Sequence, residues 1–401
     1  MAPLGPFGAA PCLAVAVSGG PHSLAAALLA RDWVAARGGR LLALVADHGL
    51  RPESGAEADH VLALLASVGI AAECLRLGLP TGARIQERAR TARLAALTEA
   101  AARHGCPWLL LGHHRGDQAE TLAFRALRGS GAAGLAAMAS LRALPECLLL
   151  RPLLSFAPAQ LEAVVAAAGL TPVRDPSNDN PRFARIRLRQ ALGDPDGEGE
   201  GILALAEAAG AFAQRRTRQQ AELLARLAAA AEIRPEGYAW VHPKALGDDA
   251  PSIMALARLI GLIGGAAWPV PIPATAALIA RGGGSLAGAW VRPGAGGRWL
   301  VVRDPGLIAP AQPLVPPFLW DGRFLLSGPA RLGWSCAALG AAAAEFRGRA
   351  SIPQTALRAL PALWDEKGKL AVLFGLFYAE GVEAEAWRVD FVPRGGGLPL
   401  G

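Results

Sequence analysis

The segment from Ser18 to Ser23 joins an apolar run to an alanine- and leucine-rich stretch of helical character. A strand that turns through two glycines into a helix leaves backbone N–H groups and the positive end of the helix dipole facing one point. Such a turn binds pyrophosphate, and serine hydroxyls at both ends add donors. An ordinary strand–turn–helix with a serine N-cap has the same local pattern. The candidate phosphate-binding residues are Ser18, Gly19, Gly20, Pro21, His22 and Ser23.

A second group of polar residues follows another apolar run, in the segment LGHHRGDQAET at 111–121. Asp117 and Glu120 are three residues apart, so on a helix they share one face and can hold an ammonium group together. His113 and His114 beside them can accept or donate protons near neutral pH. A solvated helix face would carry the same acid pair. Because the acid pair directly follows a pattern typical of a buried strand, a binding or catalytic role is favoured over a solvated helix face.

Arginines follow both groups along the chain. Arg125 and Arg128 lie further along the same predicted helix, and Arg151 directly follows a predicted strand. These three are candidates for contacts to phosphates or to a reaction intermediate, because guanidinium groups pair with phosphate oxygens in a bidentate way. A later cluster is predicted to contact a nucleic-acid backbone, although a solvated surface can carry the same residues. Its members are Arg174, Arg182, Arg185, Arg187 and Arg189.

The elements that must position these residues alternate between strands and helices. The predicted strands are Leu13–Val17, Leu41–Ala46, Ala71–Leu77, Trp108–Leu111 and Cys147–Leu150. The predicted helices between them are Ser23–Ala36, Ser54–Val68, Ile85–His104 and Gln118–Arg128. This alternation predicts an α/β fold, with a parallel twisted sheet covered by helices on both faces. Ligands of such sheets bind at the carboxyl ends of the strands, which is where the polar segments fall.

Composition along the chain predicts four parts. Residues 1–190 form the α/β catalytic domain, and the acidic, glycine-rich segment 191–201 forms a linker. Residues 202–264 form a helical region that we expect to bind RNA. Residues 265–401, richer in glycine, proline and tryptophan, form a small mixed α/β domain.

Charge and cysteine usage narrow the class of protein. The chain has 40 Lys and Arg against 33 Asp and Glu, a net charge of +7 that favours a polyanionic partner. Its five cysteines are far apart in the sequence, with no CxxC pair, so we expect reduced thiols in a cytoplasmic protein. No run of 18 apolar residues and no signal-peptide pattern occurs, so no membrane association is expected.

Five motifs in order resemble the tRNA(Ile)-lysidine synthetase family. The segment SGGPHS resembles the SGGxDS loop of ATP pyrophosphatases. The other motifs are DHGLRPES (47–54), ARTARLAAL (89–97), LGHHRGDQAETLAFRALRGSGAAGLAAM (111–138), and RPLLSF (151–156) with VRDPSNDNPRFARIRLR (173–189). The resemblance covers most of the first 190 residues and is specific in the last two motifs.

The resemblance implies a reaction in which ATP adenylates the wobble cytidine, C34, of the isoleucine tRNA with a CAU anticodon. Free L-lysine then displaces AMP at C2, so that the modified base reads AUA codons as isoleucine. It also implies ATP and Mg²⁺ at the site, and a monomer or homodimer. By the same resemblance His113, Asp117 and Glu120 contribute to lysine binding and catalysis.

The chain departs from the family pattern at a few positions. His22 replaces the loop aspartate that is expected to help place Mg²⁺ or to set the loop geometry. Gly116 stands where relatives often have an acid, and Leu94 replaces an aromatic residue. The departure at His22 leaves open a degenerate, non-catalytic tRNA-binding member. A related tRNA thiolase is a further alternative, which the absence of suitably placed cysteines disfavours.

Overall fold

The computed structural model describes residues 1–401 except 48, 50–53, 79–84, 145, 174–183, 195, 349–350, 384–385 and 394–401. The chain divides into two compact units, Met1–Thr217 and Arg218–Gly401. Within the described ranges, no helix is long and apolar enough to cross a membrane.

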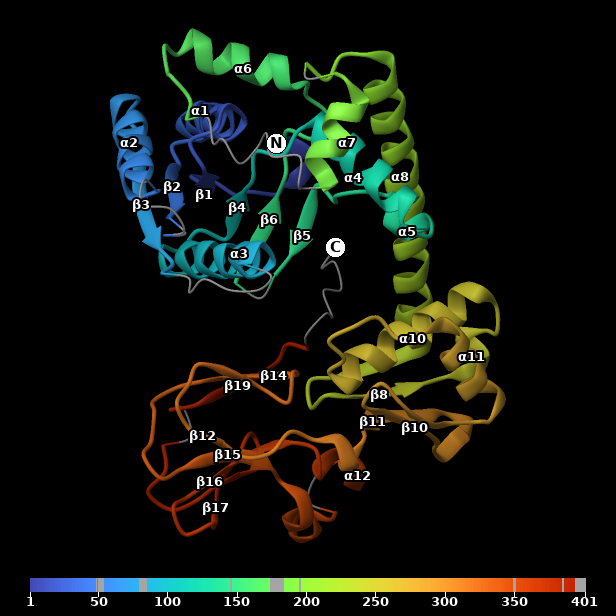
Figure 1. The fold of residues 1–401 in the computed structure, drawn as a ribbon. Coiled ribbons are helices and arrows are strands. Elements are labelled where there is room, and N and C mark those ends of the chain that lie inside the picture. The colour runs from blue at the N-terminus through green and yellow to red at the C-terminus, as the bar shows by residue number, and fades with distance from the viewer. Residues whose placement is uncertain are drawn as a thin grey trace. The chain divides into compact units, whose positions relative to one another are not determined.

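A six-stranded sheet forms the centre of the first unit, in the order β3-β2-β1-β4-β6-β5 (Figure 1). Its strands are β1 (Cys12–Val17), β2 (Arg40–Asp47), β3 (Ala71–Arg76), β4 (Trp108–Leu110), β5 (Leu141–Ala143) and β6 (Leu148–Leu150). All neighbours pair in parallel except β5, which runs antiparallel to β6. The predicted parallel α/β sheet is therefore confirmed. The three-residue strand β5, exposed throughout, was not predicted because LRA has no strand periodicity.

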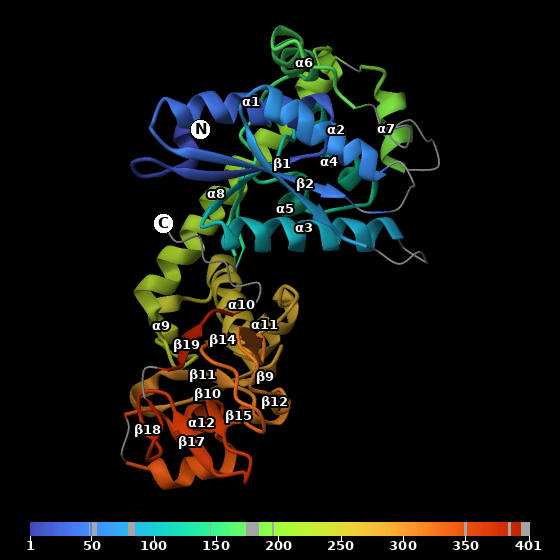
Figure 2. The same cartoon turned by 90° about the vertical axis from the view of Figure 1, so that its left-hand side faces the viewer.

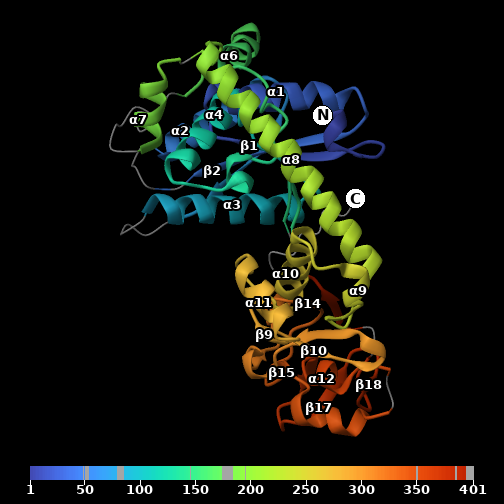
Figure 3. The same cartoon turned by 90° about the vertical axis from the view of Figure 1, so that its right-hand side faces the viewer.

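Helices cover both faces of this sheet. They are α1 (Pro21–Ala35), α2 (Ser54–Ser67), α3 (Ile85–Arg103), α4 (Arg115–Leu127), α5 (Ala132–Leu135), α6 (Pro158–Ala167), α7 (Ala184–Leu192) and α8 (Glu200–Ala230), after a short 3-10 turn at Ala2–Leu4. Helices α1 and α2 lie on one face and α3 on the other (Figure 2). Helix α8 is one continuous helix that begins in the first unit (Figure 3).

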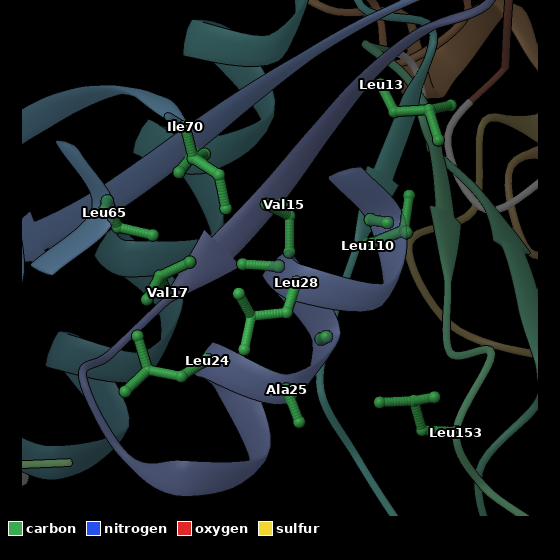
Figure 4. Packing of buried hydrophobic residues seen from close by; sticks show 14 of the residues in the cluster. Leu13, Val15, Val17, Leu24, Ala25, Leu28, Leu65, Ile70, Leu110 and Leu153 are labelled. Carbon is green, nitrogen blue, oxygen red and sulfur yellow. The ribbon is translucent and has the colours of Figure 1, made fainter. Parts of the chain in front are cut away.

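The alternation of side chains along β1 builds both halves of this core. Leu13, Val15 and Val17 belong to one buried cluster with Leu24 and Leu28 of α1 (Figure 4). Ala14 faces the other way, into a second cluster that includes residues of α3. The small side chain there lets α3 approach the sheet, and burying the larger side chains contributes about 1.5–3 kcal/mol each.

The second unit begins with an antiparallel sheet of order β7-β8-β11-β10-β9. Its strands are β7 (Ala231–Arg234), β8 (Tyr238–Val241), β9 (Gly284–Leu286), β10 (Ala289–Pro293) and β11 (Trp299–Arg303). Its helices are α9 (Pro243–Leu246), α10 (Ala250–Gly264) and α11 (Ile272–Ala280). Helix α10 is anchored by Asp249, which accepts a hydrogen bond from the Ser252 backbone N–H, and it packs on one face of the sheet.

Two further antiparallel sheets complete the second unit. One has the order β12-β15-β16-β17-β18 and the other β13-β14-β19. Their strands are β12 (Gln312–Pro313), β13 (Phe318–Trp320), β14 (Phe324–Ser327), β15 (Ser335–Ala338), β16 (Pro361–Trp364), β17 (Leu370–Leu373), β18 (Phe377–Tyr378) and β19 (Arg388–Phe391). Helix α12 (Gln354–Leu357) and three 3-10 turns (Ala295–Gly297, Pro305–Leu307 and Gly340–Phe346) lie between strands.

The compact units do not coincide with the four predicted parts. The division falls inside α8, between Thr217 and Arg218, not in the acidic segment 191–201. In that segment the Asp194 carboxylate accepts hydrogen bonds from the backbone N–H groups of Gly197 and Gly199, and this turn leads directly into α8. The region 202–264, predicted to be helical, also contains the hairpin β7–β8, whose four-residue strands are too short for a clear period-2 pattern.

Candidate active site

The predicted phosphate-binding turn has the expected strand–turn–helix geometry. Gly19 has φ of +82°, and a Cβ at this position would lie 2.5 Å from Val61, so only glycine fits. The Ser23 hydroxyl donates to the Gly20 carbonyl oxygen at 2.9 Å and accepts from the Ser18 N–H at 3.1 Å. Gly20 is the N-cap of α1 and Pro21 occupies the first turn. The turn thus directs the N-terminus of a 15-residue helix at the carboxyl end of β1.

His22 connects this turn to the segment that follows β4. Its imidazole lies edge-on to that of His114, with ring centroids 4.1 Å apart. Its Nε2 is 3.7 Å from Oε1 of Glu162 on α6. A Cβ on Gly112 would lie 2.7 Å from the His22 carbonyl oxygen, so glycine is required for this approach. The two predicted polar segments therefore meet, as expected for neighbouring parallel strands.

The N-terminus of α4 is fixed by a capping box. His114 is the N-cap, and its Nδ1 accepts a hydrogen bond from the Gly116 N–H at 3.1 Å. Oδ2 of Asp117 accepts from the His114 N–H at 3.0 Å and lies 3.5 Å from the His114 Nε2. His114 is buried. Asp117 therefore positions the start of α4 in addition to any contact with a substrate.

His113 is kept neutral by its surroundings. Burial lowers its pKa to about 4, and the nearby arginines Arg151, Arg90 and Arg93 lower it as well, while Asp117 acts in the opposite direction. Its Nδ1 is buried and has no hydrogen-bond partner in the described part of the chain. An unprotonated imidazole at neutral pH can accept a hydrogen bond but cannot act as a cation.

Glu120 lies one turn beyond Asp117 on α4, and only 5% of its surface is exposed. Between them, Gln118 holds the backbone of Met138 from both sides: Nε2 donates to the Met138 carbonyl oxygen and Oε1 accepts from its N–H. The predicted acid pair therefore occurs on a helix that is tied to the segment after α5. A buried carboxylate next to a half-buried one suits an ammonium group of a substrate.

The three arginines predicted to contact phosphates have different surroundings. Arg125 donates from Nη1 to the carbonyl oxygens of Gly134 and Ala137, so its guanidinium group holds the segment after α4. Arg128 is exposed and lies over the ring of Phe124 at 4.5 Å. Arg151 donates from Nη1 to the Ala139 carbonyl oxygen, and burial with the nearby Arg142 and Arg90 lowers its pKa to about 10.

Arg90 and Arg93 were not among the predicted site residues, although their motif was part of the resemblance. They are three residues apart on α3, so both lie on one face of that helix. Both influence the pKa of His113, and Arg90 also influences that of Arg151. The signal was present in the RTAR spacing, but only the fold brings α3 and the end of β6 together around His113.

The later arginine cluster is only partly visible. Arg174 and Arg182 lie outside the described residues. Arg185, Arg187 and Arg189 lie on α7, and Arg187 is exposed. A surface pocket here is lined by Phe124, Leu127, Arg128, Arg187 and Leu188.

The residues of the turn do not fit a carboxylate site for Mg²⁺. Position 22 carries an imidazole, whereas Mg²⁺ prefers oxygen ligands. Over the described ranges, no group of three His, Cys, Asp or Glu side chains could hold a metal ion.

The chain is similar to several known proteins. Residues 4–195 match the family model described as a PP-loop domain. A tRNA(Ile)-lysidine synthase of Novosphingobium aromaticivorans is 42% identical over 253 residues, which cover 61% of this chain and 73% of that protein. Another, from Ruegeria pomeroyi, is 34% identical over 397 residues, covering 94% and 92%. A solved U34-tRNA thiolase from Methanococcus maripaludis has a TM-score of 0.45 at 16% identity, over 53% of this chain and 76% of its own.

The match to the Ruegeria pomeroyi protein extends over nearly the whole of both chains. It therefore includes the second unit, where the sequence motifs gave no resemblance at the level of residues. The PP-loop match covers the sheet and the two polar segments described above. The chain belongs to the tRNA(Ile)-lysidine synthase family.

Proposed function

We propose that this chain is an ATP-dependent ligase that joins free L-lysine to C2 of C34 in the isoleucine tRNA with a CAU anticodon. One observation carries the proposal beyond family membership. The phosphate-binding turn after β1 and the acid pair after β4 meet through the contact between His22 and His114. This contact supports a proposed site for ATP phosphates beside a proposed site for an amine, at the carboxyl ends of adjacent strands.

ATP is expected to place its phosphates at the N-terminus of α1. The first turn of a helix leaves N–H groups without intrahelical partners, and the dipole there favours negative charge. Attack of the cytidine O2 on the α-phosphorus forms a P–O bond, breaks the bond to diphosphate and leaves the base adenylated. The residues of the turn bind and orient the phosphates during this step.

Lysine is expected to enter between α4 and the adenylated base. Glu120 and Asp117 attract its ammonium group, while neutral His113 accepts a hydrogen bond from the nitrogen without repelling it. The amine nitrogen forms the bond to C2 as the C2–O bond breaks, and AMP leaves with the electron pair. The protons lost from nitrogen pass to the basic groups of the site or to water.

The arginines around the site are proposed to bind RNA and the intermediate. Arg151, with Arg90 and Arg93, would contact the adenylated intermediate, while the exposed Arg128 and Arg187 would contact the tRNA backbone. Arg174, Arg182, Arg185 and Arg189 complete the proposed tRNA contacts. Splaying C34 out of the anticodon loop would bring C2 to the site.

The proposal has three further parts, which concern Mg²⁺, the location of the protein in the cell and its oligomeric state. We expect ATP to arrive with Mg²⁺ that keeps most of its water ligands, as this ion often does. The residues of the turn supply no carboxylate ligand for this ion. A cytoplasmic location and a homodimer remain proposals from the sequence.

The structure bears differently on the two alternatives. A thiolase would need reactive cysteines near the carboxyl ends of the strands, but Cys12 starts β1, and Cys106 and Cys147 precede β4 and β6. Cys74 lies within β3, without a second cysteine in that strand. A non-catalytic tRNA-binding protein remains the alternative that His22 favours.

Exchange of labelled diphosphate into ATP tests the enzyme proposal. We expect exchange only with the cognate tRNA, and incorporation of labelled lysine only when ATP is also present. Binding of the tRNA without either reaction would instead support the non-catalytic alternative. Glu120→Gln is expected to abolish lysine incorporation while exchange persists. Glu120 is a cleaner target than Asp117, because Asp117 also caps α4.

A further inference from the structure

Two cysteines that are far apart in the sequence meet at the amino-terminal edge of the first unit's sheet. The Sγ atoms of Cys12 and Cys106 are 2.8 Å apart, although 94 positions separate the residues. A disulfide bond has an S–S distance of about 2.05 Å. Bond formation therefore needs a movement of less than about 1 Å.

The backbone holds both residues at this edge. Cys12 is the first residue of β1 and pairs with Arg40 of β2. Cys106 follows the end of α3, where Gly105 has φ of +64° and the Cys106 N–H donates to the Ala101 carbonyl oxygen. With the Gly105 N–H bonded to Ala102, this is a Schellman motif, which fixes the exit from the helix.

Exposure gives the two thiols different roles. Cys12 is half-buried at the margin of the cluster beside α3, whereas Cys106 is buried within it. Cys147 belongs to the same cluster, and Cys74 is half-buried in β3. These two offer matched comparisons, one for burial and one for exposure.

We propose that Cys12 and Cys106 form a reversible intramolecular disulfide when the protein meets a small-molecule disulfide such as oxidised glutathione. This site is a modification site separate from the proposed active site, which lies at the other ends of β1 and β4. It would join the two strands that carry the two halves of the active site.

The chemistry proceeds in two exchange steps. The Cys12 thiolate attacks one sulfur of oxidised glutathione, which forms a mixed disulfide and releases one glutathione thiol. The Cys106 thiolate then attacks Sγ of Cys12, which forms the Cys12–Cys106 bond and releases the second glutathione. In total the protein loses two protons and two electrons, and oxidised glutathione is reduced to two thiols.

The pKa of Cys106 is compatible with its attack in the second of the two exchange steps. Burial, together with the neighbouring Cys12, raises the pKa of Cys106 to about 12. Once Cys12 is in the mixed disulfide, its sulfur is uncharged, so no negative charge at Cys12 opposes ionisation of Cys106. The nearby Arg40 favours the Cys106 thiolate.

Thiol counting and peptide mapping test the proposal on the full chain. Oxidised glutathione should reduce the count in denaturant from five thiols to three, and lower the mass by two hydrogen atoms. A proteolytic digest should contain a peptide pair linked through Cys12 and Cys106. Dithiothreitol should restore five thiols, and the oxidised protein should unfold at a higher temperature, because the bond constrains the unfolded chain.

Variants separate the proposal from general thiol oxidation. Cys12→Ser should keep Cys106 as a free thiol, whereas Cys147→Ser should still lose two thiols to the same bridge. Because Cys106 is buried and its replacement can impair folding, the peptide map of the unaltered chain decides the question. Five remaining thiols, a stable mixed disulfide at Cys12, or a bridge that involves Cys74 or Cys147 would overturn the proposal.

Discussion

Arg323 in the second unit and Arg151 in the first both have a pKa of about 10, lowered chiefly by burial. The second-largest influence has opposite signs in the two places. Asp321 raises the pKa of Arg323 through an ion pair of 2.8 Å, whereas Arg142 and Arg90 lower that of Arg151 further. A cation among other cations is stabilised when an anion binds beside it. From this difference we propose that Arg323 serves folding and Arg151 serves binding.

The carboxylate of Asp321 explains the first half of this comparison. It accepts hydrogen bonds from Arg303 and Arg323 and from the backbone N–H of Ala309. Both Arg323 and Asp321 have side chains that are 1% exposed. A buried ion pair of this kind is costly to break from one side, because the remaining charges stay buried without a partner.

Asp321→Asn should therefore have the largest effect. We expect a loss of about 3–5 kcal/mol in the free energy of unfolding, measured by urea denaturation. Asp390→Asn is the matched control, because Asp390 pairs with the exposed Arg388, and a surface pair contributes little to stability. Equal losses of unfolding free energy in the two variants would mean that the buried Asp321 network contributes no more to stability than a surface ion pair does.

Arg151→Gln should show the opposite behaviour. We expect only a small change in the unfolding temperature, because relief of repulsion from Arg142 and Arg90 opposes the loss of one hydrogen bond to Ala139. The tRNA-dependent exchange of diphosphate into ATP should fall about 10- to 100-fold, the size of a lost charge-assisted contact. Arg125→Gln is the control, since it loses hydrogen bonds to Gly134 and Ala137 and should lower stability. If Arg151→Gln destabilised the protein as much as Arg125→Gln did, its assignment to anion binding would fail.

The pH dependence of stability tests the surroundings of His113. Its pKa of about 4 lies below the ordinary value of 6.5, so between these pH values the unfolded chain binds more protons than the folded one. Stability should fall as the pH drops from about 6.5 to about 4, by roughly 1–3 kcal/mol from this residue. Urea midpoints of His113→Asn should depend less on pH, and those of exposed His60→Asn should follow the natural chain. Parallel curves for His113→Asn and the natural chain would contradict the assignment.

The smallest expected effect concerns His22. Binding of a non-hydrolysable ATP analogue, measured by calorimetry, should change little in the natural chain when Mg²⁺ is removed, because the turn supplies no carboxylate. His22→Asp should make binding several-fold stronger with Mg²⁺ than without it, and His22→Asn should not. If the natural chain lost binding without Mg²⁺ as strongly as His22→Asp, another residue would be the ligand.

The sequence predicted the strands and helices around the site because their patterns are local. The apolar run of β1, the glycines of the turn and the acid pair of α4 can each be recognised from residues that are close together in the sequence. The same reasoning suggested phosphate contacts for Arg125, and the structure shows that Nη1 of its guanidinium group donates to two backbone carbonyl oxygens. The sequence alone does not predict which group the side chain of an arginine will contact.

Features that depend on distant residues were not predicted. The proximity of Arg90 and Arg93 to His113 arises from packing of α3, and the contact of His22 with His114 needs Gly112 in the facing segment. The Cys12–Cys106 pair and the Asp321 network likewise join residues through the fold. No pattern of spacing in the sequence predicts that such residues will be neighbours in the fold.

Nucleoside analysis of the tRNA tests the central proposal most directly. The protein is incubated with the isoleucine tRNA carrying a CAU anticodon, ATP and lysine, and a matched tRNA with U34 serves as control. We expect lysidine to replace C34 in the first tRNA only, with one AMP and one diphosphate released per modified base. An unmodified C34 in a tRNA that the protein binds, with or without hydrolysis of ATP, would contradict the account.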